Sequence, residues 1–167
     1  MMKTNVRLYT FNYNEVMTYL WAMVFVICNL ALPQLFHLIP QGGVIFSPLS
    51  LVILIGAYKF GWKTGLLAAL LSPLVNHLTT GMPTMEVLPV MTLKLAVLAL
   101  VAGLTAQHFK RVSLLLLIGV ILVTKVMGGL GELLLTGGIE ATMADFVIGW
   151  PGLLMQLFGS WFFLTKF

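Results

Sequence analysis

This sequence contains few charged residues. Only 8% of its 167 residues are charged, while 60% are hydrophobic and the mean hydropathy is +1.05. A typical soluble domain carries about 25% charged residues, so this chain cannot cover a globule in water, and lipid must solvate its outside. In lipid every backbone polar group must be satisfied within the protein, which leaves helices or a closed barrel. Apolar runs such as residues 114–123 lack the alternating polarity of barrel strands and favour helices.

Cysteine and catalytic motifs are also scarce. The single cysteine, Cys28, excludes an internal disulfide and a Cys-rich metal site. The sequence has no His-Glu-x-x-His, no Gly-x-Ser-x-Gly, no phosphate-binding loop and no paired carboxylates on one helix. We therefore expect no enzyme, no metal site and no cofactor in this chain. The sequence pI of about 9.4 does not indicate nucleic-acid binding, because the basic residues lie in short loops between apolar segments.

The apolar runs, cut at proline, glycine and charged residues, predict an all-α polytopic membrane protein with about six transmembrane helices. We expect a single integral-membrane domain over residues 1–167. The predicted helices span residues 15–36, 44–60, 63–78, 87–108, 112–136 and 144–165. The third carries Pro73, which predicts a kink or an early end.

The basic residues predict the orientation. If the N-terminus is inside, the inside segments hold Lys3, Arg7, Lys59, Lys63, Lys110, Arg111 and Lys166. The outside loops, at about 37–43, 79–86 and 137–143, hold no lysine or arginine. Positive residues favour the cytoplasmic side, so both termini are predicted to be cytoplasmic, in the cell (inner) membrane. The outside loops are also longer and rich in Pro, Gly and hydrogen-bonding groups, which predicts that a ligand binds at the outer end.

Two lysines are predicted to lie inside the membrane, Lys94 and Lys125. Each costs a few kcal/mol there unless it faces a partner or a wet cavity. In one interpretation, a lysine pairs with Glu132 or Asp145 and holds the bundle together. In the other, one or both lysines receive an anionic group of a solute from outside. One face of the fifth helix carries four residues at i, i+3, i+4 and i+7: Lys125, Gly128, Gly129 and Glu132.

Further candidates for substrate binding lie near the predicted outer ends: Gln34, His37, Asn76, His77 and Trp150. Each histidine is either an ordinary interface residue or part of the site. Trp150 either belongs to the interfacial aromatic belt or stacks on a ligand.

Small residues recur at four-residue spacing, as in Gly65 with Ala69, Ala68 with Ser72, and Ala99 with Gly103. Such pairs permit close approach of helices, either inside the bundle or against another membrane subunit.

Several short motifs follow one another in order. They are Pro-Gln-Leu-Phe-His-Leu at 33–38, Ser-Pro at 47–48, Gly56, Tyr-Lys-Phe-Gly-Trp-Lys-Thr-Gly at 58–65, Leu-Ser-Pro-Leu at 71–74, Thr-Gly-Met-Pro at 80–83 and Leu-Pro-Val-Met at 88–91. With them, residues 48–103 resemble the substrate-binding (S) components of energy-coupling factor (ECF) vitamin transporters. The last third of the chain matches only in hydropathy.

The resemblance implies a six-helix subunit of an ABC-type importer that binds a vitamin or related micronutrient from the outer side. Its implied partners are a membrane coupling (T) subunit and two cytoplasmic ATPase subunits that use ATP. Two features depart from the family pattern. Its first helix often carries Ala-x-x-x-Ala, whereas Ala22 is followed by Val26 here, and Lys94 stands where related members often have Glu.

A lysine in the place of that glutamate favours an anionic solute, and pantothenate, lipoate, biotin and folate all carry a carboxylate. The alternative is a non-transport membrane scaffold or assembly factor whose lysines are structural.

Overall fold

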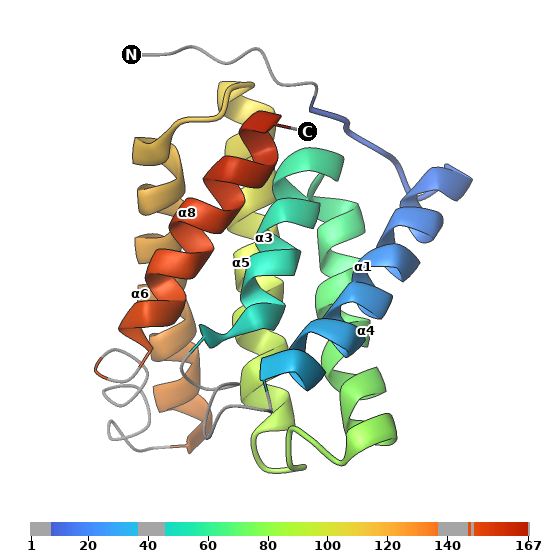
Figure 1. The fold of residues 1–167 in the computed structure, drawn as a ribbon, viewed down its shortest axis with the longest axis vertical. Helices are drawn as coiled ribbons and strands as arrows, with labels where there is room; N and C mark the ends of the chain where they lie inside the picture. The colour runs from blue at the N-terminus through green and yellow to red at the C-terminus, as the bar shows by residue number, and fades with distance from the viewer. Residues whose placement is uncertain (1–7, 37–45, 137–146, 148, 167) are drawn as a thin grey trace.

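The structure is a computed structural model, and it describes residues 8–36, 46–136, 147 and 149–166. In this part of the chain six α-helices form an upright bundle (Figure 1). They are α1 (Val16–Phe36), α3 (Pro48–Phe60), α4 (Trp62–Thr80), α5 (Leu88–Phe109), α6 (Leu114–Thr136) and α8 (Trp150–Lys166). The predicted all-helical fold is confirmed.

Four helices, α1, α4, α5 and α6, lie close to their predicted ranges. Of the other two, α3 runs from Pro48 and α8 from Trp150, while residues 44–45, 144–146 and 148 of their predicted ranges lie outside the described residues. The predicted early end at Pro73 is wrong, because α4 continues through this proline to Thr80. Proline is tolerated inside membrane helices because neighbouring groups can satisfy the backbone groups that it leaves unbonded.

The short helix α3 lies with α5 at the centre of the bundle (Figure 1). Helices α1 and α4 flank them on one side, and α6 and α8 on the other. With 13 residues, α3 is about 20 Å long at 1.5 Å per residue, less than the roughly 30 Å of a hydrocarbon core. Its residues 52–60 are all buried, so the surrounding helices shield it from lipid.

The outside of the bundle is apolar. Large hydrophobic side chains are exposed on several helices, among them Leu78, Leu115 and Leu134. Within the described residues, α1, α5 and α6 contain segments long and apolar enough to cross a membrane, and α3 is a shorter apolar helix. The exposed apolar surface is therefore the surface that faces lipid.

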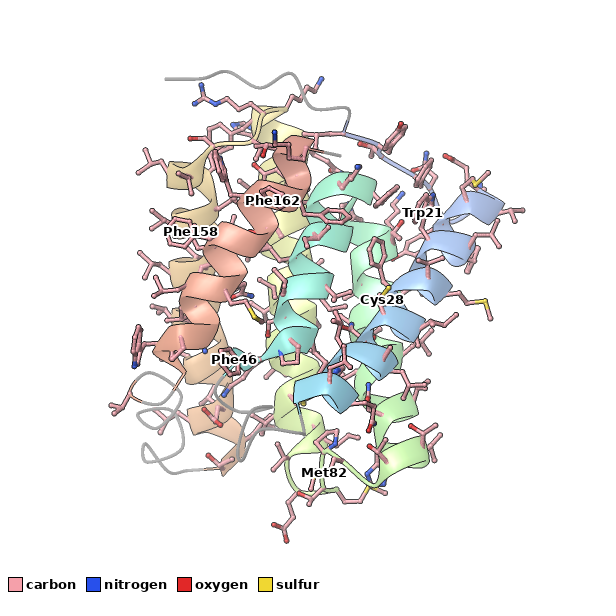
Figure 2. All side chains as sticks on the ribbon, viewed as in Figure 1. Trp21, Cys28, Phe46, Met82, Phe158 and Phe162 are labelled. Carbon is pink, nitrogen blue, oxygen red and sulfur yellow. The ribbon has the colours of Figure 1, made fainter. Side chains whose placement is uncertain are left out.

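The two ends of the bundle differ in charge. The α3–α4 and α5–α6 turns lie at the same end as the last turn of α8 (Figure 1). This end carries Lys59, Lys63, Lys110, Arg111 and Lys166. We call it the inner end, after the orientation that the basic residues predict. Trp21 lies toward the inner end and Met82 lies at the opposite, outer end (Figure 2).

The inner half of the bundle is held together by close backbone contacts. A Cβ atom added at Gly65 would lie 2.4 Å from the Cβ of Ala57, and one added at Gly103 would lie 2.4 Å from the Cα of Trp62. No real Cβ fits at such distances, so glycine is required where α4 and α5 cross their neighbours. Internal packing of these predicted small residues is confirmed.

Candidate functional site

A cavity of about 520 Å³ lies in the outer half of the bundle, bordered by α1 at Pro33, by α3, α4, α5 and α6, and by the start of α8. Small-molecule sites commonly have volumes of about 300–1,000 Å³. The first turn of α3, at Pro48, Leu49 and Ser50, borders the cavity. The apolar part of the wall is formed by Leu49, Val90, Met91, Leu95, Leu98, Ile121 and Leu153.

Polar side chains from several helices converge on the same cavity. They are Ser47, Ser50, Asn76, Thr80, Lys94, Thr124, Lys125, Glu132 and Gln156. The two glycines between Lys125 and Glu132, Gly128 and Gly129, also line it. The predicted common face of these four residues is therefore confirmed, and it is the face that α6 turns toward the cavity.

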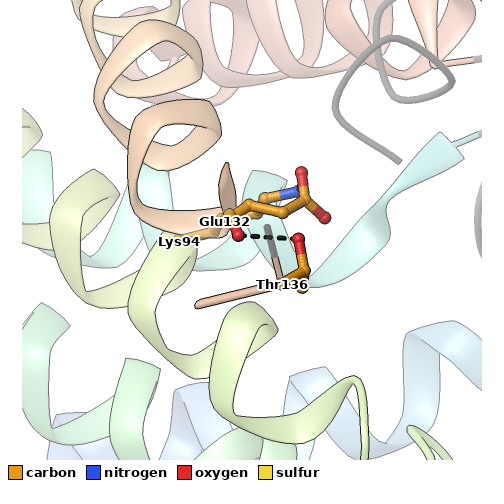
Figure 3. Close-up of polar contacts among 3 residues, drawn as sticks. All are labelled: Lys94, Glu132 and Thr136. Atoms are coloured by element: carbon orange, nitrogen blue, oxygen red, sulfur yellow. Dashed lines mark hydrogen bonds and ion pairs between the residues drawn. The ribbon is translucent and has the colours of Figure 1, made fainter. Parts of the chain in front are cut away.

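An ion pair lies in the cavity wall. The Nζ atom of Lys94 is 2.8 Å from the Oε2 atom of Glu132, with side-chain exposures of 25% and 9%. Figure 3 shows the two side chains together, with the Thr136 hydroxyl donating a hydrogen bond to the Glu132 main-chain carbonyl at 2.8 Å. Of the predicted pairings, Lys94 with Glu132 is observed, and Asp145 lies outside the described residues.

Gly128 gives the stem of Lys94 room beside α6. A Cβ atom on Gly128 would lie 3.1 Å from the Cγ of Lys94, closer than most such contacts allow. The lysine stem therefore lies against the bare backbone of α6, and Glu132 is one turn further along the same face. Side chains of an α-helix point toward its N-terminus, which for α5 is the outer end, so Lys94 extends outward to meet Glu132.

Asn76 connects the cavity to α1. Its Nδ2 group donates to the Asn29 carbonyl at 3.0 Å and to the Ser72 carbonyl at 2.8 Å, and the Asn29 side chain donates to the Ser72 hydroxyl at 2.9 Å. The Asn29 carbonyl would normally accept from residue 33, but Pro33 has no N–H. Asn76 supplies the missing donor from the neighbouring helix.

Three predicted residues that the structure describes do not line the cavity: Gln34, His77 and Trp150. His77 lies beside it, with Nδ1 2.7 Å from the Pro83 carbonyl. Because a carbonyl can only accept, Nδ1 is the donor, and the bond fastens the α4–α5 loop. Gln34 and Trp150 are exposed on the bundle surface. His37 lies outside the described residues.

Several polar cavity residues were not among the predicted site residues, chiefly Gln156, Thr124 and Ser50. A signal existed for Gln156, which follows Gly152 at i+4 in the last apolar run and so shares its face. That is the pattern which identified Lys125 and Glu132. Thr124 carried the same signal, since it lies four residues before Gly128 and so shares its face.

The fold and cavity define a multi-pass helical membrane protein with a solute-sized pocket in its outer half. A family model described as "ECF transporter, substrate-specific component" matches residues 15–165, and the chain belongs to this family. Neither the curated proteins nor the solved structures give a match to this chain.

The chain is thus the substrate-specific subunit of an ECF importer, and its family is one of transporter components rather than of enzymes. Membership implies a small-molecule substrate and partnership with T and ATPase subunits.

Proposed function

We propose that this subunit binds a carboxylated micronutrient in the outer cavity for ATP-driven uptake across the cytoplasmic (inner) membrane. The main observation that supports this proposal is a solute-sized cavity whose wall combines two lysines with apolar side chains. Ionisable residues within a membrane bundle are functional candidates by default. A hydrogen bond from an ammonium group to a carboxylate is about twice as strong as a neutral one. The apolar wall suits the uncharged body of such a solute.

The ion pair between Lys94 and Glu132 also suits the rival interpretation, in which the lysine only holds α5 against α6. Membership of a substrate-binding family supports the transport role. A purely structural pair also needs no cavity, whereas both of these side chains border one.

Mass spectrometry of small molecules that co-purify with the chain from its native host tests the proposal. We expect a carboxylated micronutrient in stoichiometric amount. A scaffold would retain lipid only, and that outcome would remove the proposed function. A stoichiometric neutral vitamin would retain the transport role and refute the carboxylated substrate.

We also propose that this chain holds no resident cofactor and that ATP is used by its partner subunits. The sequence has no phosphate-binding loop, so we expect the purified chain in liposomes to show no ATP-stimulated uptake. Uptake should appear only when the T and ATPase subunits are reconstituted with it. ATP-driven uptake by the single chain would contradict the proposal that only the partner subunits use ATP.

A further inference from the structure

Gln156 on α8 borders the cavity, and only 6% of this residue is exposed. Among the residues that the structure describes, none forms a hydrogen bond with its side chain. A carboxamide carries two N–H donors and an oxygen that can accept two bonds, and buried polar groups in proteins are nearly always hydrogen-bonded. The side chain of Gln156 therefore has its hydrogen-bonding capacity available to a molecule in the cavity.

Three other uncharged polar side chains of the wall use their donors on the protein itself. The side-chain amide of Asn76 donates to two main-chain carbonyls. The hydroxyls of Thr80 and Thr124 donate to carbonyls of their own helices. These bonds give the three residues a structural role, which the described contacts of Gln156 do not.

The face of α8 that leads to Gln156 is open. Gly149, Gly152 and Leu153 precede it at the spacing of one helix face and also border the cavity. Two of these three residues are glycines, so they put no side chain over that face. Side chains of an α-helix point toward its N-terminus, which for α8 is the outer end, so the amide group of Gln156 extends along this face into the cavity.

The charged residues of the cavity lie on other helices, Lys94 on α5 and both Lys125 and Glu132 on α6. An ionic group of the solute is bound best there, because hydrogen bonds between charged groups are about twice as strong as neutral ones. The uncharged amide of Gln156 suits an uncharged part of the same solute. A group that offers both a donor and an acceptor, such as an amide or a ureido group, uses this side chain most fully.

We infer that Gln156 is a substrate-binding residue that recognises an amide or ureido group of the solute. This inference rests on the proposed function and narrows the substrate to a carboxylate that also carries such a group. A site that hydrogen-bonds a polar group discriminates strongly against an analogue without it, because the buried polar atoms of the site are then left unpaired.

A mixture of carboxylated vitamins tests this substrate class. The purified full chain in lipid nanodiscs is incubated with equimolar pantothenate, biotin, folate, lipoate and nicotinate and then washed, and the retained molecules are measured by mass spectrometry. The first three carry an amide or ureido group, and the last two carry neither. Biotin and lipoate are the closest pair, since each has a pentanoate chain on a sulfur-containing ring. We expect one of the first three to bind at least about tenfold more tightly than lipoate and nicotinate.

The outcomes distinguish this inference from the proposed function. Retention of lipoate or nicotinate at the level of the other three or above would overturn the role of Gln156 and leave a carboxylated substrate in place. Retention of none of the five would overturn the carboxylated substrate itself.

A substitution of Gln156 tests the contact directly. Gln156→Met keeps the length of the side chain and removes its donors and its acceptor. We expect the preferred vitamin to bind roughly ten- to a hundredfold more weakly and lipoate to bind as it does to the parent. The ligand-free variant should melt at no lower temperature, because replacing an unpaired buried amide with an apolar group removes no contact of the fold.

Gln107→Met is the matched control, since Gln107 lies near the inner end of α5 and does not border this cavity, and it should bind the vitamin as the parent does. Unchanged affinity in Gln156→Met would remove Gln156 from the site. A lower melting temperature with equal losses for the vitamin and for lipoate would make Gln156 a packing residue only.

Discussion

At the scale of single residues, Lys94 has two separable tasks. Its bond to Glu132 joins α5 to α6, and in the proposed function its ammonium group also binds the solute. Removing the lysine would leave a bound carboxylate buried without its partner, at a cost of about 2–5 kcal/mol. Lys94→Met keeps the length of the side chain, and we expect affinity for the retained carboxylate to fall by roughly 30-fold to several thousandfold.

Titration by calorimetry, together with thermal unfolding, separates the two tasks. If Lys94 were structural only, the variant would melt at a lower temperature and keep its dissociation constant once folded. Lys166→Met removes a lysine at the inner end, away from the cavity, and should leave affinity unchanged.

Glycine packing gives a second test at this scale. Gly103 lies against the backbone of Trp62, where a Cβ would approach to 2.4 Å, while Gly119 on α6 has nothing within 4 Å of its added Cβ. Gly103→Ala therefore forces two helices apart, and overpacking of this kind typically costs about 1–3 kcal/mol. We expect a lower melting temperature for Gly103→Ala in detergent and no loss for the matched Gly119→Ala. Identical melting temperatures of the two variants would show that the contact between Gly103 and Trp62 has room for a Cβ atom.

At the scale of helices, the sequence was most informative where apolar length and charge decide the outcome. The runs that became α1, α4, α5 and α6 could be found because the bilayer fixes how long such a run must be. The start of α3 at Pro48 could also be predicted, since proline directly after Ser47 is typical of a first helical turn. For α1 and α8, the sequence did not predict which face of the helix is directed at the cavity. Gln34 and Trp150 are near the outer end as predicted, but they are exposed and do not line the cavity.

The sequence narrowed the partner of Lys94 to Glu132 or Asp145 but could not choose between them. Glu132 is 38 residues away on another helix, and only the packing of α5 on α6 at Gly128 selects it. The face of α6 that carries Lys125 and Glu132 was predictable because its residues belong to one helix and follow its period.

The link between α1 and α4 can be tested by a double-mutant cycle. Asn76→Leu removes the donor to the Asn29 carbonyl, which Pro33 cannot replace, and an unpaired buried carbonyl costs about 1–3 kcal/mol. Pro33→Ala provides a backbone N–H four residues after Asn29. We therefore expect Pro33→Ala to recover part of the stability lost in Asn76→Leu, with thermal unfolding as the measurement. Strictly additive effects would mean that the two residues do not share this carbonyl.

At the scale of the whole molecule, the orientation is the prediction on which the direction of transport depends. The basic residues favour a cytoplasmic location for the α5–α6 turn. In a Cys28→Ala background, we expect Lys110→Cys to resist an impermeant maleimide in intact cells and to react after permeabilisation. Thr84→Cys, on the exposed α4–α5 loop, should react in intact cells. The reverse pattern would invert the topology.

The unequal packing of the two halves of the bundle also has a kinetic consequence. Along α5, Ala99, Ala102 and Ala106 are buried in the inner half, whereas Val90 and Met91 border the outer cavity. A helix normally frays at both ends, and its amide protons exchange with solvent according to the local cost of opening. In α5, deuterium should therefore enter the turns beside the cavity sooner than the buried turns at Ala99, Ala102 and Ala106. A bound solute should slow that exchange and leave the inner half, already slow, unchanged.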